Sequence, residues 1–156
     1  MTSPAWDLPL PHVHRLVVRP EEIDAYQHVN NAVYVEWLDA AAWGHSAALG
    51  MPVETCVALD RGMAVVRTVI AYRRAAVLGD GVLVGTWLLP GESRMRVRRR
   101  FQVVREADGE TLVRAEIDYA SIELSTGRPA RWPDAFKVSY AILPEVEAAA
   151  PALAAL

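Results

Sequence analysis

Two patterns of hydrophobic and polar residues follow one another in the N-terminal third of the chain: a short strand-like alternation and then a longer helical repeat. Residues 14–19 alternate polar and apolar side chains, which predicts a short strand that Pro20 ends or confines to a sheet edge. At residues 31–49 the apolar positions follow a helical repeat, and Gly50 and Pro52 are typical of the end of a helix. The second half of this segment is small and largely apolar, so we expect other elements to enclose it.

Four further segments with strand patterns follow, and no second convincing helix appears before the tail. The segments are residues 63–74, 82–89, 94–105 and 111–124. Gly79-Asp80-Gly81, Pro90-Gly91 and Asp108-Gly109 separate them and predict turns between consecutive antiparallel strands. Because no helix separates successive strands, a doubly wound parallel sheet is excluded, and the predicted fold class is α+β.

Length and composition set the number of domains. The chain has 156 residues, of which 53% are hydrophobic, and this suffices for one compact domain with its own core. We predict an N-terminal extension at residues 1–13 and one domain at residues 14–143. The alanine-rich residues 144–156 are predicted to form a tail, either as a frayed helix or as a disordered end.

Charge and cysteine content narrow the classes of function. The net charge of -3 lacks the basic excess that nucleic-acid or membrane partners require, so we expect neither. Cys56 is the only cysteine, which excludes an internal disulfide framework. Neither a signal peptide nor a transmembrane run is apparent, and we therefore expect a cytoplasmic location.

The densest group of chemically active residues lies directly ahead of the predicted helix. The run from Asp24 to Tyr34 contains one carboxylate, one imidazole and two asparagines. The N–H groups exposed at the start of a helix can hold a developing negative charge. This combination is suited to attack on an acyl carbonyl.

The same run resembles the signature of acyl thioesterases of the 4-hydroxybenzoyl-CoA thioesterase-like family. The signature is matched at Asp24, His28, Val29, Asn30 and Tyr34. Gln27 stands where the family has a glycine. Further similar segments, which include residues 65–67, 71–73 and 123–129, extend the resemblance over roughly residues 14–136. It implies a hotdog fold, in which a five-stranded antiparallel sheet wraps around one long central helix.

The resemblance also implies a reaction and a set of roles. Asp24 matches the catalytic carboxylate, which acts either as a nucleophile through a mixed anhydride or as a base that activates water. The backbone N–H of Asn31 matches the donor that polarises the thioester carbonyl. The substrate is then an acyl-CoA or an acyl-carrier-protein thioester, with no cofactor beyond the coenzyme A or phosphopantetheine of the substrate. Family members pair their protomers, which implies a homodimer or homotetramer.

The residues of the motif also have purely structural interpretations. Asp24 can be a turn carboxylate or helix cap, and Asn30 and Asn31 can be caps. His28 can be a buried imidazole bonded to the backbone or a group that supports catalysis. A metal held by Asp24 and His28 would have no third ligand, so no metal site is predicted. Plant acyl-ACP thioesterases share a similar stretch, but Tyr26 replaces the asparagine of their polar trio.

Candidate substrate-binding residues surround the motif and lie on two of the predicted strands. They are Tyr26, Asn30, Tyr34, Trp37, Arg67 and Arg96. Tyr34 and Trp37 are one helical turn apart and can serve the core or border the acyl group. Arg94, Arg96, Arg98 and Arg100 alternate along one strand, which indicates either a solvated sheet face or contacts to the phosphates of coenzyme A.

Two other functions are compatible with a hotdog fold. A hydratase or dehydratase acting on an enoyl thioester would need its own arrangement of histidine and acidic residues, and the motif at Asp24 argues against it. A module that binds or senses acyl thioesters without turnover would keep the pocket, but an intact Asp24 argues against that function as well.

Overall fold

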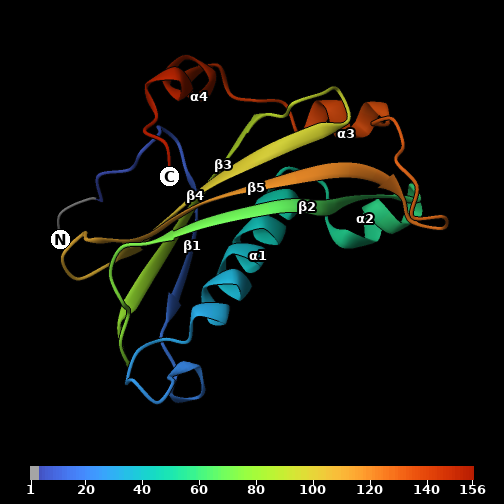
Figure 1. Ribbon diagram of the computed structural model, residues 1–156. Helices are drawn as coiled ribbons and strands as arrows, with labels where there is room; N and C mark the ends of the chain where they lie inside the picture. The colour runs from blue at the N-terminus through green and yellow to red at the C-terminus, as the bar shows by residue number, and fades with distance from the viewer. Residues whose placement is uncertain (1–3) are drawn as a thin grey trace.

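In a computed structural model that describes residues 4–156, a five-stranded antiparallel sheet covers one long helix (Figure 1). The strands are β1 His12–Val17, β2 Arg61–Tyr72, β3 Gly81–Pro90, β4 Arg96–Arg105 and β5 Thr111–Glu123. The helices are α1 Asn31–Ala48, α2 Val53–Ala58, α3 Asp134–Ser139 and α4 Pro144–Ala149, and short 3-10 turns span Pro20–Glu22 and Ala150–Ala152. This confirms the α+β class that the sequence pattern predicted, and the sheet around one long helix that the resemblance implied. Residues 1–3 of the predicted extension lie outside the described residues.

The order of strands in the sheet is β1-β3-β4-β5-β2, and every neighbouring pair is antiparallel. The β3–β4 and β4–β5 hairpins confirm two of the predicted turns. The expected hairpin between β2 and β3 is wrong, because β2 pairs with β5 at the far edge of the sheet. Residues 73–80 instead pack around the start of α1, where the buried Ala76 donates its N–H to Tyr34 Oη at 2.8 Å and accepts the Val29 N–H at 3.0 Å.

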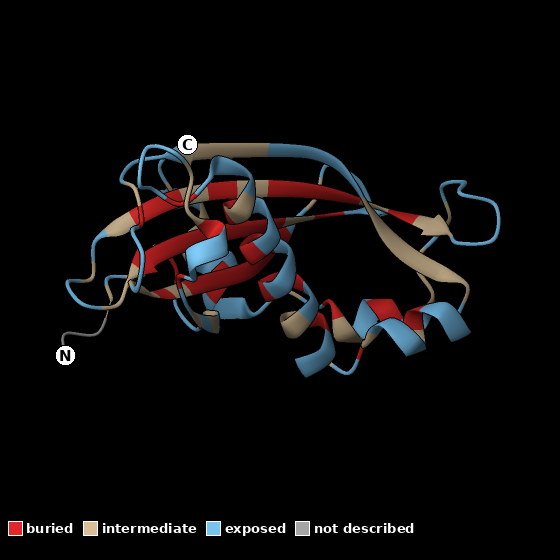
Figure 2. Cartoon of the chain, turned by 90° about the horizontal axis from the view of Figure 1, so that it is seen from below, coloured by how far each residue is buried: buried red, intermediate tan, exposed pale blue. Residues whose placement is uncertain are grey.

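Helix α1 forms the centre of the core. Its first turn is capped by Asn30, whose Oδ1 accepts the Ala32 N–H at 2.9 Å, and Gly50 adopts a φ of 81° just beyond its end. The side of α1 that faces the sheet is buried together with the inward positions of the strands (Figure 2). The predicted cap, length and end of this helix are therefore confirmed.

Two short helices contradict the expectation that no second helix precedes the tail. Helices α2 and α3 have six residues each, and Cys56 and Phe136 are their buried positions. Six residues span fewer than two turns, so neither segment is long enough to show a helical repeat. Within the predicted tail, α4 buries Val146 against Leu8, Trp87 and Leu89, so the tail is at least partly helical.

The outer face of the sheet is covered by the N-terminal segment and α4. The Trp6 ring lies over Gly85, where a Cβ atom would approach it to 2.6 Å, so a side chain at this position would displace the ring. Asp7 accepts hydrogen bonds from Arg114 at 2.8 Å and from Arg100 at 3.3 Å. Arg100 is only 1% exposed, and the predicted solvated arginine face is therefore wrong at this position, because the N-terminal segment closes over it.

Candidate functional site

The loop between the first 3-10 turn and α1 holds Asp24 in a tight turn. Its Oδ1 accepts the Tyr26 N–H at 2.8 Å, and its own N–H donates to the His28 carbonyl at 2.8 Å. Gln27 has a φ of 61°, a left-handed conformation that favours glycine. This is the position where the family signature has its glycine. Asp24 therefore occupies a turn, as the structural interpretation predicts, and its Oδ2 accepts no hydrogen bond from residues 4–156.

Glu22 anchors this loop to the core. Its buried carboxylate accepts the Arg19 N–H at 2.7 Å and the Trp37 indole N–H at 3.1 Å, and its carbonyl accepts the Asn30 N–H at 2.9 Å. Burial raises the pKa of Glu22, but the hydrogen bonds from Arg19 and Trp37 outweigh burial and lower it overall. Glu22 thus stays ionised and fixes the chain on both sides of Asp24.

The structure assigns Tyr34 and Trp37 to packing. Both are buried, at 2% and 5% exposure, and their rings meet edge-to-face with centroids 4.9 Å apart. The polar atoms of both side chains are engaged, with Ala76 and Glu22 respectively. They belong to the core cluster, and their contact with substrate stays a prediction.

The first turn of α1 leaves a donor free beside this loop. Asn30 caps the N–H of Ala32, whereas the N–H of Asn31 finds no acceptor in the described part of the chain. The Asn31 carbonyl accepts the Tyr72 hydroxyl at 2.9 Å, which ties this turn to β2. A free N–H at the start of an 18-residue helix is suited to stabilising an oxyanion.

The remaining predicted residues lie at the surface. His28 is exposed, so its interpretation as a buried imidazole is wrong, and Tyr26 is 84% exposed. The guanidinium of Arg67 lies 3.7 Å from Asp118, and that of Arg96 lies 3.6 Å from Glu92. No group of three or more potential metal ligands occurs in residues 4–156.

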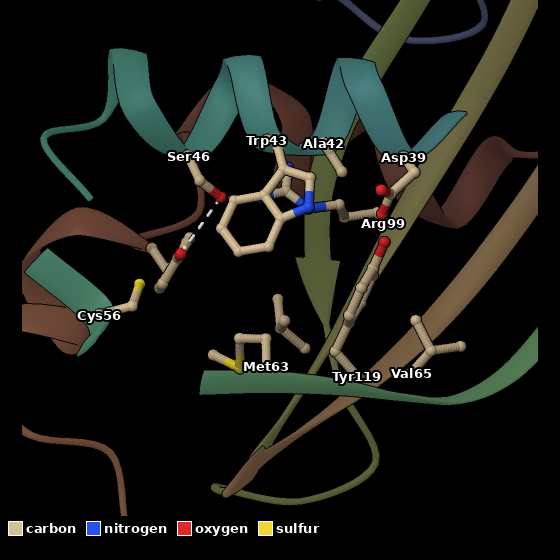
Figure 3. Close-up of a pocket in the computed structure, with 11 residues that line it drawn as sticks. Asp39, Ala42, Trp43, Ser46, Cys56, Met63, Val65, Arg99 and Tyr119 are labelled. Atoms are coloured by element: carbon tan, nitrogen blue, oxygen red, sulfur yellow. Dashed lines mark hydrogen bonds between the residues drawn. The ribbon is translucent and has the colours of Figure 1, made fainter. Parts of the chain in front are cut away.

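A pocket that is open to solvent lies between the second half of α1, α2 and the inner face of the sheet (Figure 3). Its lining is Asp39, Ala42, Trp43, Ser46, Cys56, Met63, Val65, Val97, Arg99, Tyr119 and Tyr140. Just over half of the lining side chains are apolar, and the polar ones are buried except for the exposed Asp39. This combination is typical of a small-molecule site.

Arg99 organises the buried end of the pocket. Its guanidinium donates to Ser46 Oγ at 2.9 Å and lies 2.8 Å from His45 Nδ1, and Tyr140 donates its hydroxyl to Ser46 Oγ at 3.1 Å. Burial, with the charges of Arg99 and His12, lowers the pKa of His45 to about 3. His45 is therefore neutral and can accept from Arg99.

Asp24 and this pocket lie along different parts of α1 within one protomer. Asp24 precedes the first turn of the helix, whereas the helical residues that line the pocket begin at Asp39 and end at Ser46. Asp24 is not among the residues that line this pocket. One copy of the chain thus holds both parts of a candidate site without bringing them together.

A second, wider cleft lies at the turn between β3 and β4. Its lining is Pro90, Gly91, Ser93, Arg94, Met95, Arg96, Arg131, Trp132 and Lys137. Four of these side chains are cationic, and the buried indole N–H of Trp132 has no hydrogen-bond partner in residues 4–156. The predicted candidate Arg96 therefore belongs to a cationic cleft.

Comparisons with known proteins agree with this architecture. The model of the thioesterase-like superfamily matches residues 18–139. Among curated proteins, the long-chain acyl-CoA thioesterase FadM of Escherichia coli K12 is 30% identical over 112 residues, which cover 72% of this chain and 83% of FadM.

Solved structures of similar fold include two from other bacteria. A 1,4-dihydroxy-2-naphthoyl-CoA thioesterase from Synechocystis matches with a TM-score of 0.75 and 16% identity, over 83% of this chain and 94% of that one. A Staphylococcus aureus protein, solved in complex with CoA, matches with a TM-score of 0.77 and 20% identity, over 88% and 85% of the two chains.

The fold and the family match define a thioester hydrolase of the hotdog fold. The chain belongs to the thioesterase-like superfamily. Among the helices that the structure describes, none is both long and apolar enough to cross a membrane.

Proposed function

We propose that Asp24 is the catalytic carboxylate of an acyl-CoA hydrolase whose complete site forms between two copies of the chain. The observation that carries this proposal is that one short segment presents two unused groups. One carboxylate oxygen of Asp24 accepts no hydrogen bond from residues 4–156, and the N–H of Asn31, seven residues further on, has no acceptor there. The relationship to FadM supports the acyl-CoA substrate class.

The chemistry follows from these two groups. The N–H of Asn31 donates to the thioester carbonyl oxygen and stabilises the negative charge that develops on it. Asp24 either attacks the carbonyl carbon to form a mixed anhydride or takes a proton from the attacking water. In both routes the carbon–sulfur bond breaks and the thiolate leaves and takes a proton. In the first route water then hydrolyses the anhydride, which frees Asp24, so that the acyl group ends as a free acid in either case. His28 lies on the same exposed loop, where we assign it a supporting role.

Strand β2 supports a dimer, because it forms an edge of the sheet and remains long and apolar. It has 12 residues, and Val65, Val66 and Tyr72 are about half exposed. The exposed apolar residues Trp43 on α1 and Val57 on α2 extend this surface. A long unprotected edge strand of this kind is normally paired or covered. We therefore propose that two copies pair through β2 across a two-fold axis.

This pairing would bring Asp24 of one protomer to the pocket of the other. Two copies of β2 related by a two-fold axis run antiparallel, and so do the two α1 helices beneath them. The start of one α1 then lies toward the second half of the other. The Asp24 loop of one protomer would thus face the mouth of the pocket in its partner, at Trp43 and Val65.

The cationic cleft offers a place for the phosphates of coenzyme A. Arg94, Arg96, Arg131 and Lys137 all line it, and guanidinium groups bind phosphate well. We propose Arg96 as a contact for the coenzyme, while Arg67, exposed on the β2 edge, remains a candidate. A carrier-protein substrate, a homotetramer and a cytoplasmic location stay predictions.

The test is a thiol-release assay over a panel of acyl-CoA and carrier-protein thioesters, comparing the native chain with Asp24→Asn. Asparagine can still accept the Tyr26 N–H through Oδ1, so the turn is kept while the carboxylate is lost. We expect kcat to fall at least about 100-fold at unchanged melting temperature. Equal rates would count against the carboxylate, binding without thiol release would indicate a sensor, and hydration of an enoyl thioester would indicate a lyase.

A further inference from the structure

We propose that the acyl group accepted by this protein carries an anionic oxygen, a carboxylate or an ionised hydroxyl, which Arg99 and Tyr119 bind at the buried end of the pocket. This inference rests on the proposed function, because it names the substrate class of the same site. Arg99 and Tyr119 are polar groups of the pocket whose hydrogen-bonding capacity residues 4–156 leave partly or wholly unused.

Arg99 is a buried cation without a carboxylate partner. It is 4% exposed, and no acidic side chain in residues 4–156 lies within ion-pair distance of it. Its neighbour Arg100, 1% exposed on the opposite face of the same strand, is paired with Asp7 and Glu116 at 3.3 Å and 2.9 Å. A buried charge is costly unless it is paired. The contrast indicates that the partner of Arg99 arrives from outside the protomer.

The donors of Arg99 are only partly used. The guanidinium has five N–H donors, and two of its nitrogens contact Ser46 and His45, both uncharged. These contacts, with the Tyr140 ring 6.0 Å from the guanidinium carbon, fix the side chain in place. The side chain is therefore held rigidly while its charge remains unneutralised.

Tyr119 supplies the second unused group. Its ring lines the same pocket at 7% exposure, and its buried hydroxyl has no hydrogen-bond partner in residues 4–156. Burial raises the pKa of Tyr119 to about 12, so the phenol stays protonated and can donate. In Figure 3 its hydroxyl points toward Arg99 and Asp39. A buried hydroxyl without a partner is costly, and a ligand oxygen would satisfy it.

The rest of the pocket places the anion at the far end of the acyl group. Asp39, Trp43 and Val65 are the exposed residues of the lining, and Ala42, Met63 and Val97 give it apolar surface. Asp39 is the carboxylate of this lining; it is exposed, and its negative charge adds to burial in raising the pKa of Tyr119. An acyl chain that enters at the mouth passes apolar side chains before its end reaches the two donors.

The experiment compares coenzyme A thioesters of equal chain length, made from hexanoic acid and from hexanedioic acid, with hydroxybenzoyl-CoA as a third arm for an ionised hydroxyl. We expect kcat/KM for at least one oxygen-bearing thioester to exceed that for hexanoyl-CoA by about tenfold or more, as for a charge-assisted hydrogen bond. The preferred arm identifies the source of the anion. A preference for hexanoyl-CoA over both would overturn the inference.

Two tyrosine variants separate binding from folding. Tyr119→Phe removes a hydroxyl that bonds to nothing in the described chain, so the melting temperature of the variant should not fall. The ratio of kcat/KM for the oxygen-bearing thioester to that for hexanoyl-CoA should fall toward one. Tyr34→Phe, the control, removes a hydroxyl bonded to Ala76 outside the pocket, and it should lower the melting temperature without changing the preference. An unchanged preference in Tyr119→Phe would also overturn the inference.

Calorimetry distinguishes failure of this inference from failure of the proposed function. If no thioester is hydrolysed, the hydrolase function fails, but the binding of the same thioesters to the native protein still decides the inference. Tighter binding of an oxygen-bearing thioester supports it, and equal or weaker binding contradicts it.

Discussion

At the scale of single residues, the backbone N–H of Asn31 has a role that can be separated from that of its side chain. The N–H is free, whereas the asparagine side chain makes no hydrogen bond within residues 4–156. Asn30 precedes it with φ −57° and ψ 136°, a conformation that a following proline tolerates. Proline is also well accepted at the first position of a helix. Position 31 can therefore lose its N–H without losing the helix.

We predict opposite results for two substitutions at this position. Asn31→Ala keeps the N–H and should retain kcat within a few-fold, because the side chain takes no part. Asn31→Pro removes the N–H and should lower kcat by about 100-fold to 1,000-fold with little change in melting temperature. Steady-state assays and thermal melts check both variants, and an active, folded proline variant would exclude this N–H as the oxyanion donor.

Part of the site could be predicted at the residue scale because it is local in sequence. The carboxylate, the cap at Asn30 and the free N–H occupy one short run before the helix. Arg99 was not predicted, because the alternating arginines of its strand indicate the opposite face of the sheet. A charged residue at an inward position between Val97 and Phe101 was the available signal. Tyr119 and Tyr140 carry no such signal, since only the fold brings them to Arg99.

At the scale of elements, the N-terminal segment acts as a cover for the outer face of the sheet. Asp7 joins Arg100 of β4 to Arg114 of β5, and Trp6 and Leu8 belong to the cluster that includes Trp87. We predict that Asp7→Asn lowers the free energy of unfolding by about 2 kcal/mol at neutral pH, because Arg100 stays buried with one carboxylate fewer. Chemical denaturation measures this change.

The same substitution has a defined pH dependence. Burial raises the pKa of Asp7, but Arg114 and Arg100 outweigh burial and hold it below the ordinary value of 3.8. A lowered pKa stabilises the fold above the unfolded pKa, and this contribution is lost as the pH falls through the folded pKa. The free energy of unfolding of the native chain should therefore exceed that of Asp7→Asn by about 2 kcal/mol from pH 5 to 7. This difference should shrink below about pH 3.8. The exposed Asp134→Asn should change stability little, and an equal effect of both would contradict the account.

Long elements could be predicted from the sequence and short ones could not. The helix α1 and four strands have enough residues for their repeats to show, and their ends fall within two residues of the prediction. Helices α2 and α3 are stabilised by tertiary contacts of Cys56 and Phe136, which no local pattern reveals. The pairing of β2 with β5 joins segments that are far apart in sequence. Turn residues indicate only which consecutive strands form a hairpin, so they could not predict this pairing.

At the scale of the whole molecule, the edge strand β2 is the surface on which the dimer depends. Val66 is 46% exposed at a bulge of this strand, where the register with β5 shifts. We predict that Val66→Asp sediments as a monomer and loses hydrolysis, because a charge at the edge opposes pairing. The control is Val138→Asp on α3, 79% exposed, which should stay a dimer with native activity. A native chain that is active as a monomer would rule out the shared site.

The central claim, that Asp24 of one protomer serves the pocket of its partner, is tested most directly by mixing two inactive variants. Asp24→Asn lacks the carboxylate, and Ala42→Leu fills the pocket wall. If the site is shared, each mixed dimer contains one intact site, and an equal mixture that has exchanged subunits should recover about a quarter of native activity. An exchanged mixture as inactive as its two parents would show that carboxylate and pocket act within one chain, and would contradict the account.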